Sequence, residues 1–181
     1  MKKTFIIFSA ALLMAGFATT ATAQTSATVA ATAAGTKLVV PMTLTQTSPL
    51  HFGTVNVLAG TGGTVQLPSN STTRVISTGL AASTVAPLAT NAAYNVTGTM
   101  NATYALTLPA TIVVTETVGA TAVMTISALT ARFNGAAEDA VVSTLSATGT
   151  DNFTVGGTLT VAAAQTSGIY AGTFPVTVDY N

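Results

Sequence analysis

Apolar and polar residues alternate along the last fourteen residues of the chain, 168–181. The apolar side of this pattern consists of the even-numbered positions Tyr170, Gly172, Phe174, Val176, Val178 and Tyr180. Successive side chains of a strand point to opposite faces, so the pattern predicts one long strand with a buried face and a face in water. A lone strand can neither cover its apolar face nor pair its backbone groups, so we expect this one to lie against a sheet.

Shorter runs of the same alternation recur through the rest of the chain. The predicted strands cover residues 37–46, 64–68, 74–77, 93–97, 103–108, 110–117, 122–129, 141–147 and 153–161. Strands 93–97 and 103–108 are expected to pair, and for 141–147 the pattern leaves open which face is buried. Many short strands with turn signals between them, and no sustained period of 3.6, predict an all-β fold built as an antiparallel sandwich of two sheets.

Three sets of residues mark turns or irregularities between or within these strands. Asn134-Gly135 is typical of a two-residue hairpin with a type I′ turn. Gly156-Gly157 interrupts its strand and indicates a bulge or a close backbone crossing. Gly60 to Gly63 is interpreted as a turn rather than a phosphate cradle, because a strand pattern and not a helix follows it.

The first 23 residues have the three parts of a secretory signal peptide. Basic residues at 2–3 precede an apolar run from Phe5 to Phe17, and Ala21-Thr22-Ala23 stands before Gln24. We therefore predict cleavage between Ala23 and Gln24 and export of the mature chain. No later apolar run is long enough to span a bilayer as a helix, so no membrane span is expected in the mature chain.

Residues 24–36 form an N-terminal extension of small side chains ahead of a predicted sandwich domain at 37–181. Its odd-numbered positions share one weakly apolar face, made of Ala27, Val29, Ala31, Ala33 and Gly35. These residues suit a donor strand that fills a groove in another sandwich. A flexible leader fits the same composition equally well.

Composition and charge exclude several classes of function. Charged residues make up 6% of the chain, and removing Lys2 and Lys3 with the signal peptide leaves 5 − 2 = 3 basic against 5 acidic residues. Nucleic-acid binding needs clustered Lys and Arg, so we expect no nucleic-acid partner. Cysteine is absent, so the stability of an exported chain must come from packing rather than from disulfides.

The inventory of reactive side chains is too small for catalysis. With one His, no Cys and five carboxylates, the chain is predicted not to be an enzyme and to hold neither metal nor cofactor. His51 is interpreted as a core or strand-edge residue. Glu138 and Asp139 are interpreted as a solvated loop rather than a calcium site, because two adjacent carboxylates lack the dense set of oxygens that calcium needs.

Five short motifs of turns and core strands carry a family resemblance. They are Leu50-x-Phe52-Gly53, Gly62-Gly63-Thr64-Val65, Tyr104-x-Leu-x-Leu-Pro109, Phe153-x-Val-Gly-Gly-Thr-Leu159 and Gly168-x-Tyr-x-Gly-x-Phe174. Together they resemble the secreted bacterial proteins of the domain-of-unknown-function 4402 group. The resemblance spans most of the mature chain and implies a shared fold, but no activity.

The C-terminal stretch carries a second resemblance. Gly168 stands fourteen residues from the end and Tyr180 is penultimate, which is similar to the last strand of chaperone-usher pilus subunits. The likeness implies an immunoglobulin-like, pilin-like sandwich with an open groove, covered first by a periplasmic chaperone and later by the N-terminal extension of the next subunit. It marks Gly168, Tyr170, Phe174, Val176, Val178 and Tyr180 as the groove edge. The missing cysteines depart from many pilins, and Pro175 lacks a donor, so that position should point away from an incoming strand.

Two functions remain open after this reading. The first is a structural subunit of a bacterial surface filament, a fimbria or pilus, which passes through the periplasm with a chaperone and usher and assembles by strand donation. The second is a self-contained secreted or cell-surface module that binds carbohydrate or protein. Binding modules usually expose aromatic platforms, whereas this chain has no Trp and its four Tyr lie in strand patterns.

Overall fold

A computed structural model describes residues 33–58 and 60–181 of the chain. The chain divides into two units, Met1–Lys37 and Leu38–Asn181, and every strand of the described residues lies in the second unit. The predicted cleavage site at Ala23 and Gln24 lies outside the described residues, as do donor positions Ala27, Val29 and Ala31. Ala33 and Gly35 are described and exposed.

The second unit is built from strands, and the described residues contain no helix. The strands are β1 (Thr43–Ser48), β2 (His51–Phe52), β3 (Val55–Val57), β4 (Gly63–Leu67), β5 (Val75–Ile76), β6 (Leu80–Ala82), β7 (Ala89–Thr90), β8 (Ala92–Thr97), β9 (Thr103–Thr107), β10 (Thr111–Glu116), β11 (Val123–Phe133), β12 (Val142–Thr144), β13 (Thr150–Val161), β14 (Tyr170–Ala171) and β15 (Thr177–Tyr180).

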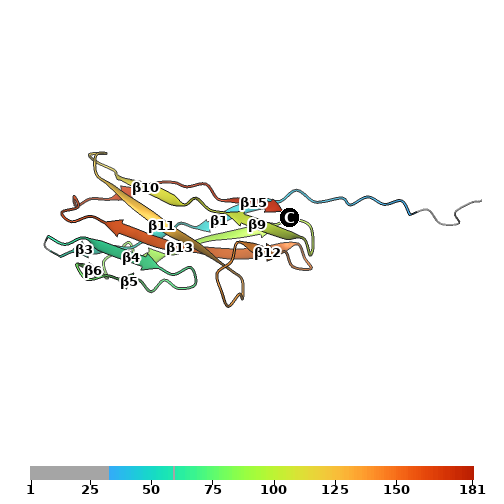
Figure 1. Cartoon of the computed structure of the whole chain (residues 1–181), viewed down its shortest axis with the longest axis horizontal. Coiled ribbons are helices and arrows are strands. Elements are labelled where there is room, and N and C mark those ends of the chain that lie inside the picture. The colour runs from blue at the N-terminus through green and yellow to red at the C-terminus, as the bar shows by residue number, and fades with distance from the viewer. Residues whose placement is uncertain (1–32, 59) are drawn as a thin grey trace, which may run out of the picture. The chain divides into compact units, whose positions relative to one another are not determined.

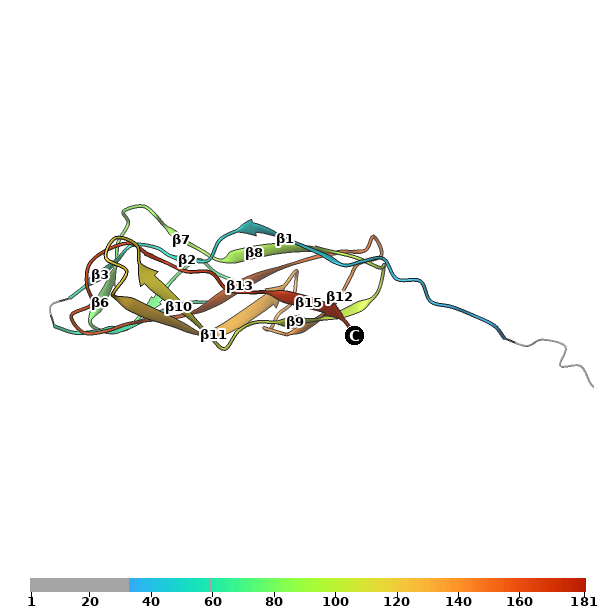
Figure 2. The ribbon, with the colours of Figure 1, turned by 90° about the horizontal axis from the view of Figure 1, so that it is seen from above.

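The strands form the predicted antiparallel β-sandwich. One sheet has the order β1-β8-β13-β11-β10-β14, with β4 and β5 added beside β13, and the facing sheet has the order β12-β9-β15 (Figure 1). Two further pairs, β2 with β7 and β3 with β6, close loops outside the sheets. The smaller sheet lies at the end of the unit where the C-terminus is, and β3, β6 and β10 lie toward the other end (Figure 2). The all-β, antiparallel sandwich is therefore confirmed, with two small two-stranded sheets beside its two main ones.

The core consists of two clusters along the sandwich. The first cluster, near the smaller sheet, is Ala92, Tyr94, Val96, Tyr104, Leu106, Ala131, Phe133, Leu145, Phe153 and Val155. The second cluster is Phe52, Val65, Leu67, Leu80, Ile112, Val114, Ile126, Leu159 and Val161. β13 contributes to both because its inward residues continue along twelve positions. In the first cluster the rings of Tyr94 and Phe153 stack at 5.1 Å, an arrangement that adds to burial alone.

Gly156 and Gly157 lie inside β13, which continues through them and changes partner there from β8 to β4. A Cβ on Gly156 would collide with the carbonyl oxygen of Leu67, so the predicted close backbone crossing is present. The bulge is on the partner strand instead, between Ser127 and Thr130 of β11, where Ala128 has a φ of 49°. The sequence marked the right place but not the strand that is irregular.

The predicted pairing of 93–97 with 103–108 is wrong. β8 pairs with β1 and β13 in the large sheet, whereas β9 pairs with β12 and β15 in the facing sheet. Val96 and Leu106 both enter the first core cluster, from opposite sides. Alternation reports which side of a strand is buried, and it cannot tell a hairpin from a connection that crosses between sheets.

Two local predictions are also corrected. The first strand begins at Thr43 and not at residue 37, and Pro41, which has no N–H, precedes it. At Asn134-Gly135 the N–H of Ala136 donates to the carbonyl of Phe133 at 3.0 Å, so a turn is present. Gly135 has a φ of 70°, but Asn134 is not at positive φ, which is the pattern of a type II turn and not of type I′.

Candidate functional site

The C-terminal stretch is not one continuous strand, as the alternation predicted, but two short strands in different sheets. β14 pairs with β10, and β15 pairs with β9. Residues 172–176 between them belong to no strand. The segment from β9 to β10 also changes sheet, and the C-terminal stretch runs alongside it in the opposite direction. Both segments therefore cross between the two sheets at the same place.

Two prolines explain where the β15 ladder stops. The N–H of Asn181 donates to the carbonyl of Thr103 at 3.1 Å, so the odd-numbered residues of β15 exchange hydrogen bonds with β9. Extending this register beyond Thr177↔Thr107 places Pro175 opposite Pro109. Neither residue has an N–H, so the next pair of ladder bonds cannot form.

The predicted alternation of side chains is confirmed, but the inward side is incompletely covered. The inward residues Tyr170, Phe174, Val176, Val178 and Tyr180 are half-buried, and the odd-numbered residues from Ala171 to Asp179 are exposed. The last four inward residues pack on the first core cluster, and Phe174 also contacts the second. Gly172 is itself exposed. The described residues therefore leave part of this apolar side open.

β15 is an edge strand among the described residues, because β9 is its one partner there. Since the odd-numbered residues face β9, the backbone groups of Val176, Val178 and Tyr180 point to the opposite, open edge. In the extended register Pro175 falls on the β9 side. We call Phe174, Val176, Val178 and Tyr180 the C-terminal edge.

Among the described residues, β1 is the edge strand of the large sheet on the side of β8. Following the antiparallel pairs from β1 through β8, β13, β11 and β10 to β14 shows that β1 and the C-terminal stretch run in opposite directions. Met42 and Leu44 are half-buried and pack on the same core cluster as the C-terminal edge. One cluster thus has two incompletely covered borders, one on each sheet.

Tyr180 links these two borders. Its hydroxyl donates to the carbonyl oxygen of Val40 at 2.6 Å and accepts from the N–H of Thr99 at 2.6 Å. A Cβ on Gly98 would collide with this hydroxyl, so a glycine is required beside it. The penultimate tyrosine therefore fixes Val40, three residues ahead of β1.

Gly168 and Gly172 allow close contact with β10. A Cβ on Gly168 would lie 2.8 Å from Cγ of Glu116, and one on Gly172 would lie 2.6 Å from the carbonyl oxygen of Val113. Glu116 is 7% exposed and accepts hydrogen bonds from the N–H groups of Gly119 and Val118. These two backbone donors lower the pKa of the Glu116 carboxyl.

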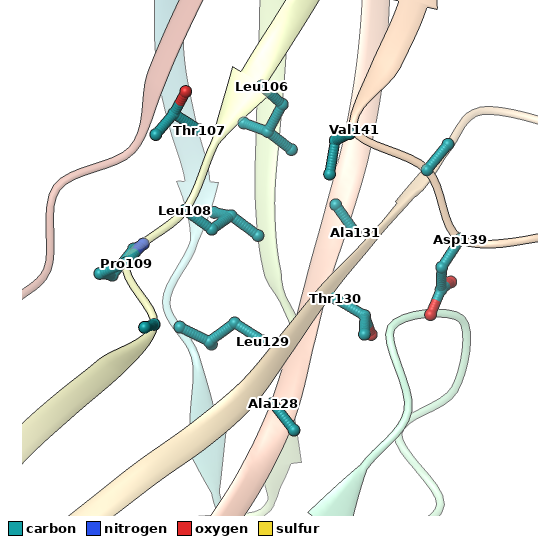
Figure 3. A pocket seen from close by; sticks show the side chains of 12 residues that line it. Leu106, Thr107, Leu108, Pro109, Ala128, Leu129, Thr130, Ala131, Asp139 and Val141 are labelled. Atoms are coloured by element: carbon teal, nitrogen blue, oxygen red, sulfur yellow. The ribbon is translucent and has the colours of Figure 1, made fainter.

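An open hollow of about 660 Å³ lies where the chain leaves β9 for β10 (Figure 3). Its apolar lining includes Leu106, Leu108, Leu129, Ala131 and Val141. Asp139 stands at the side of the hollow, and its carboxylate is already bound by Ser69 and Arg132. The lining suits an aliphatic group and offers few polar groups that could orient a ligand.

The strand beside this hollow is a poor acceptor for another strand. The bulge between Ser127 and Thr130 of β11, with Ala128 at positive φ, breaks the regular spacing of backbone groups. Bulges are a common way to protect a sheet edge from pairing with other chains. The β15 register with β9 has no such irregularity from Thr177 to Tyr180.

The polar residues singled out from the sequence have structural roles. His51 lies in β2, and its Nδ1 accepts a hydrogen bond from the N–H of Gly53 at 2.8 Å, as expected of a strand-edge histidine. The turn at Gly60 leads into β4 and not into a helix, as predicted. Glu138 and Asp139 lie in an exposed loop, as predicted, and the carboxylate of Asp139 also accepts hydrogen bonds from Ser69 at 2.5 Å and from Arg132 at 2.7 Å.

Among residues 33–58 and 60–181, no group of three or more His, Cys, Asp or Glu side chains is placed to hold a metal ion. The same residues contain no helix long and apolar enough to cross a membrane.

Three features of the site were missed from the sequence. The contact of Tyr180 with Val40 and Thr99 joins distant residues, and the required glycine at position 98 was its one local sign. The hollow forms because the chain passes from one sheet to the other at Pro109. Alternation of apolar and polar residues does not show where a chain changes sheet. The pairing of Ser69 with Asp139 spans 70 residues and left no local signal.

Comparison with known proteins gives one match. The family described as "Domain of unknown function (DUF4402)" matches residues 42–180, which include every strand from β1 to β15. No curated protein and no solved structure matches. The match covers the sandwich from its first strand to the penultimate residue, and the chain belongs to the DUF4402 family.

Proposed function

We propose that this protein is a non-enzymatic structural subunit of a bacterial surface filament, a fimbria, which assembles by β-strand donation. The observation that carries the proposal is the C-terminal edge. There, β15 and the residues just before it combine backbone groups that no described strand pairs with a half-buried apolar side, both over the same core cluster. A strand added at this edge supplies backbone hydrogen-bond partners and also covers the half-buried apolar side chains.

The donated strand in this proposal is residues 24–36 of a second copy. Its backbone pairs with Val176, Val178 and Tyr180, and each such hydrogen bond contributes about 0.5–1.5 kcal/mol net. The small side chains of Ala27, Val29, Ala31, Ala33 and Gly35 face Phe174 and its neighbours. Small side chains suit a border that is already half-buried, because less space is left to fill than in a fully open groove.

Export and delivery belong to the same proposal. The predicted signal peptide sends the chain across the inner membrane, and the filament stands on the cell surface. In the periplasm an exposed apolar edge strand invites aggregation. A chaperone that covers the C-terminal edge would prevent this aggregation. An usher would then replace the chaperone with the next subunit.

The experiment is SDS electrophoresis of the purified mature protein, heated and unheated, beside a version without residues 24–35. Donation predicts a ladder of heat-sensitive multimers from the full chain and none from the shortened one. A synthetic peptide of residues 24–36 should then raise the melting temperature of the shortened chain. The matched control peptide carries Asn in place of Val29 and Ala31. A folded monomer in both lanes would rule the proposal out.

A second candidate function is a self-contained module that binds an apolar group, and the hollow at Leu129 favours it. This second function requires that the sandwich be a stable monomer without residues 24–36. Filling the hollow by Ala131→Leu should then block binding of an apolar reporter dye, while Val142→Leu on the exposed face of β12 should not. The hollow lacks aromatic residues, which carbohydrate sites usually present.

A further inference from the structure

We infer that Leu38 and Val39 of one copy pack against Val118 and Ile169 of the next copy, so that the subunits meet head to tail. This inference rests on the proposed function and adds to it the second contact between subunits and the direction of the donated strand. It is drawn from exposed apolar residues at the two ends of the sandwich unit.

The first partner in this contact is the stretch just before β1. Leu38 is 88% exposed and Val39 52% exposed. The next residue, Val40, is held to the domain by two hydrogen bonds. Its N–H donates to Oγ1 of Thr99, and its carbonyl oxygen accepts from the hydroxyl of Tyr180. Leu38 and Val39 are thus exposed directly before a residue that is fixed to the domain, and they follow the end of the 24–36 extension.

The second partner lies beyond β10. Val118 is 91% exposed and Ile169 is 73% exposed. Their segments are joined by a hydrogen bond of 2.8 Å from the N–H of Thr117 to the carbonyl of Ile169. The turn that carries Val118 is held by the carboxylate of Glu116. This is an ordered apolar surface at the end of β10 and β14 away from β15.

The direction of the donated strand decides which surfaces meet. The C-terminal stretch runs from Tyr170 to Tyr180, about 33 Å at 3.3 Å per residue. A donor strand antiparallel to it enters near Tyr180 and leaves near Tyr170. Residues 24–36 are long enough for this path, and Leu38 of the donor then emerges beside Val118 and Ile169 of the acceptor.

A parallel donor gives a different assembly. Leu38 would then emerge at the Tyr180 end of the acceptor, near Met100, which is 63% exposed. The two copies would present the same end to each other, so each could donate to the other in a closed pair. An antiparallel donor joins opposite ends and leaves both outer ends free, which is the heterologous contact that a filament needs. Antiparallel pairing is also the commoner arrangement.

The first test is disulfide cross-linking between copies, which the absence of native cysteine makes unambiguous. The double variant Leu38→Cys/Ile169→Cys is compared with Leu38→Cys/Met100→Cys, both in the full mature chain under mild oxidation. We expect a covalent ladder that survives heating for the first variant and none for the second. A covalent dimer between copies of the second variant, or no cross-link in either variant while heat-sensitive multimers still form, overturns the head-to-tail contact but not strand donation.

The second test replaces the apolar contact without adding a cross-link. Ile169→Asn should speed dissociation of the multimers on heating at least tenfold, and Val142→Asn, at an exposed valine of β12, should leave it unchanged. Equal rates for the two variants overturn the contact. Thermal unfolding of the shortened chain with each substitution shows whether the sandwich itself is intact. Absence of multimers from the unaltered protein would instead overturn strand donation, and this inference with it.

Discussion

The hydroxyl of Tyr180 donates a hydrogen bond of 2.6 Å to the carbonyl oxygen of Val40, 140 residues earlier in the chain. The bond joins the last strand to the residue that leads into the first one. Because β1 and β15 belong to different sheets, it also connects the two sheets at one end of the sandwich. The penultimate tyrosine therefore serves the fold as well as the C-terminal edge.

Tyr180→Phe is expected to destabilise the sandwich by about 1–2 kcal/mol, because the carbonyl of Val40 and the N–H of Thr99 each lose a partner. Urea unfolding of the shortened chain measures this. Tyr94→Phe is the matched control, since the Tyr94 hydroxyl forms no hydrogen bond with a described side chain or backbone group, and it should cost less. Equal losses for the two variants would mean that the Tyr180 hydroxyl contributes nothing specific.

Gly172→Ala is expected to cost about 1–3 kcal/mol, because the new methyl group would press on the carbonyl oxygen of Val113, which is backbone and cannot turn aside. Gly168→Ala should cost less, since its methyl group meets the side chain of Glu116, which has some freedom to move. Gly35→Ala is the control, with no atom within 4 Å of the new group. Denaturant midpoints order the three variants. The reverse order at positions 168 and 172 would contradict the packing of this stretch on β10.

Stability should fall in acid because of Glu116. The N–H groups of Gly119 and Val118 lower the pKa of its carboxyl below the ordinary value of 4.5, so the carboxylate form favours folding. This contribution is complete above about pH 4.5 and is lost as the pH drops through the lowered pKa of the folded state. Glu116→Gln should flatten the decline of stability between pH 5 and pH 3. An unchanged slope would show that another carboxylate governs it.

Alternation along the chain was sufficient to predict most strands, because a strand of a sandwich has one wet face and one dry face. The strands β10 and β11 came from this signal, and so did the inward side of the C-terminal edge. The signal is local, however, and contains no information on which strands are neighbours. This is why β8 and β9 were paired wrongly, although both were found.

The site could be predicted in part for the same reason. The residues of the C-terminal edge were identified from their spacing, but the break between β14 and β15 arises from Pro109 facing Pro175 across the ladder. Which proline faces which depends on the register between β9 and β15, and the sequence around each proline does not contain that register. The exposure of Leu38 was likewise hidden, because an aliphatic run next to a strand normally indicates burial.

The hydrogen bond between Ser69 and Asp139 should hold the 134–141 loop to the sandwich. Ser69 is buried, and a hydrogen bond to a charged group contributes about 1.5–3 kcal/mol. A double-mutant cycle of Ser69→Ala with Asp139→Ala is expected to show positive coupling. Glu138→Ala, at the exposed neighbouring carboxylate, should change stability by less than about 0.5 kcal/mol. Additive losses would show that the serine does not support the loop through Asp139.

Amide hydrogen exchange along β15 should alternate from one residue to the next. The N–H groups of Thr177, Asp179 and Asn181 face β9, so their exchange requires the strand to open. Those of Val176, Val178 and Tyr180 point to the open edge and should exchange much faster in the chain without residues 24–35.

Adding the peptide of residues 24–36 should then slow exchange at Val176, Val178 and Tyr180 while changing Thr177 and Asp179 little. General stabilisation of the sandwich would slow all of these amides together, so the alternating pattern separates a strand added at the edge from a ligand bound elsewhere. Protection at the even positions before any peptide is added would mean that the sandwich already covers its own edge, and strand donation would lose its structural basis.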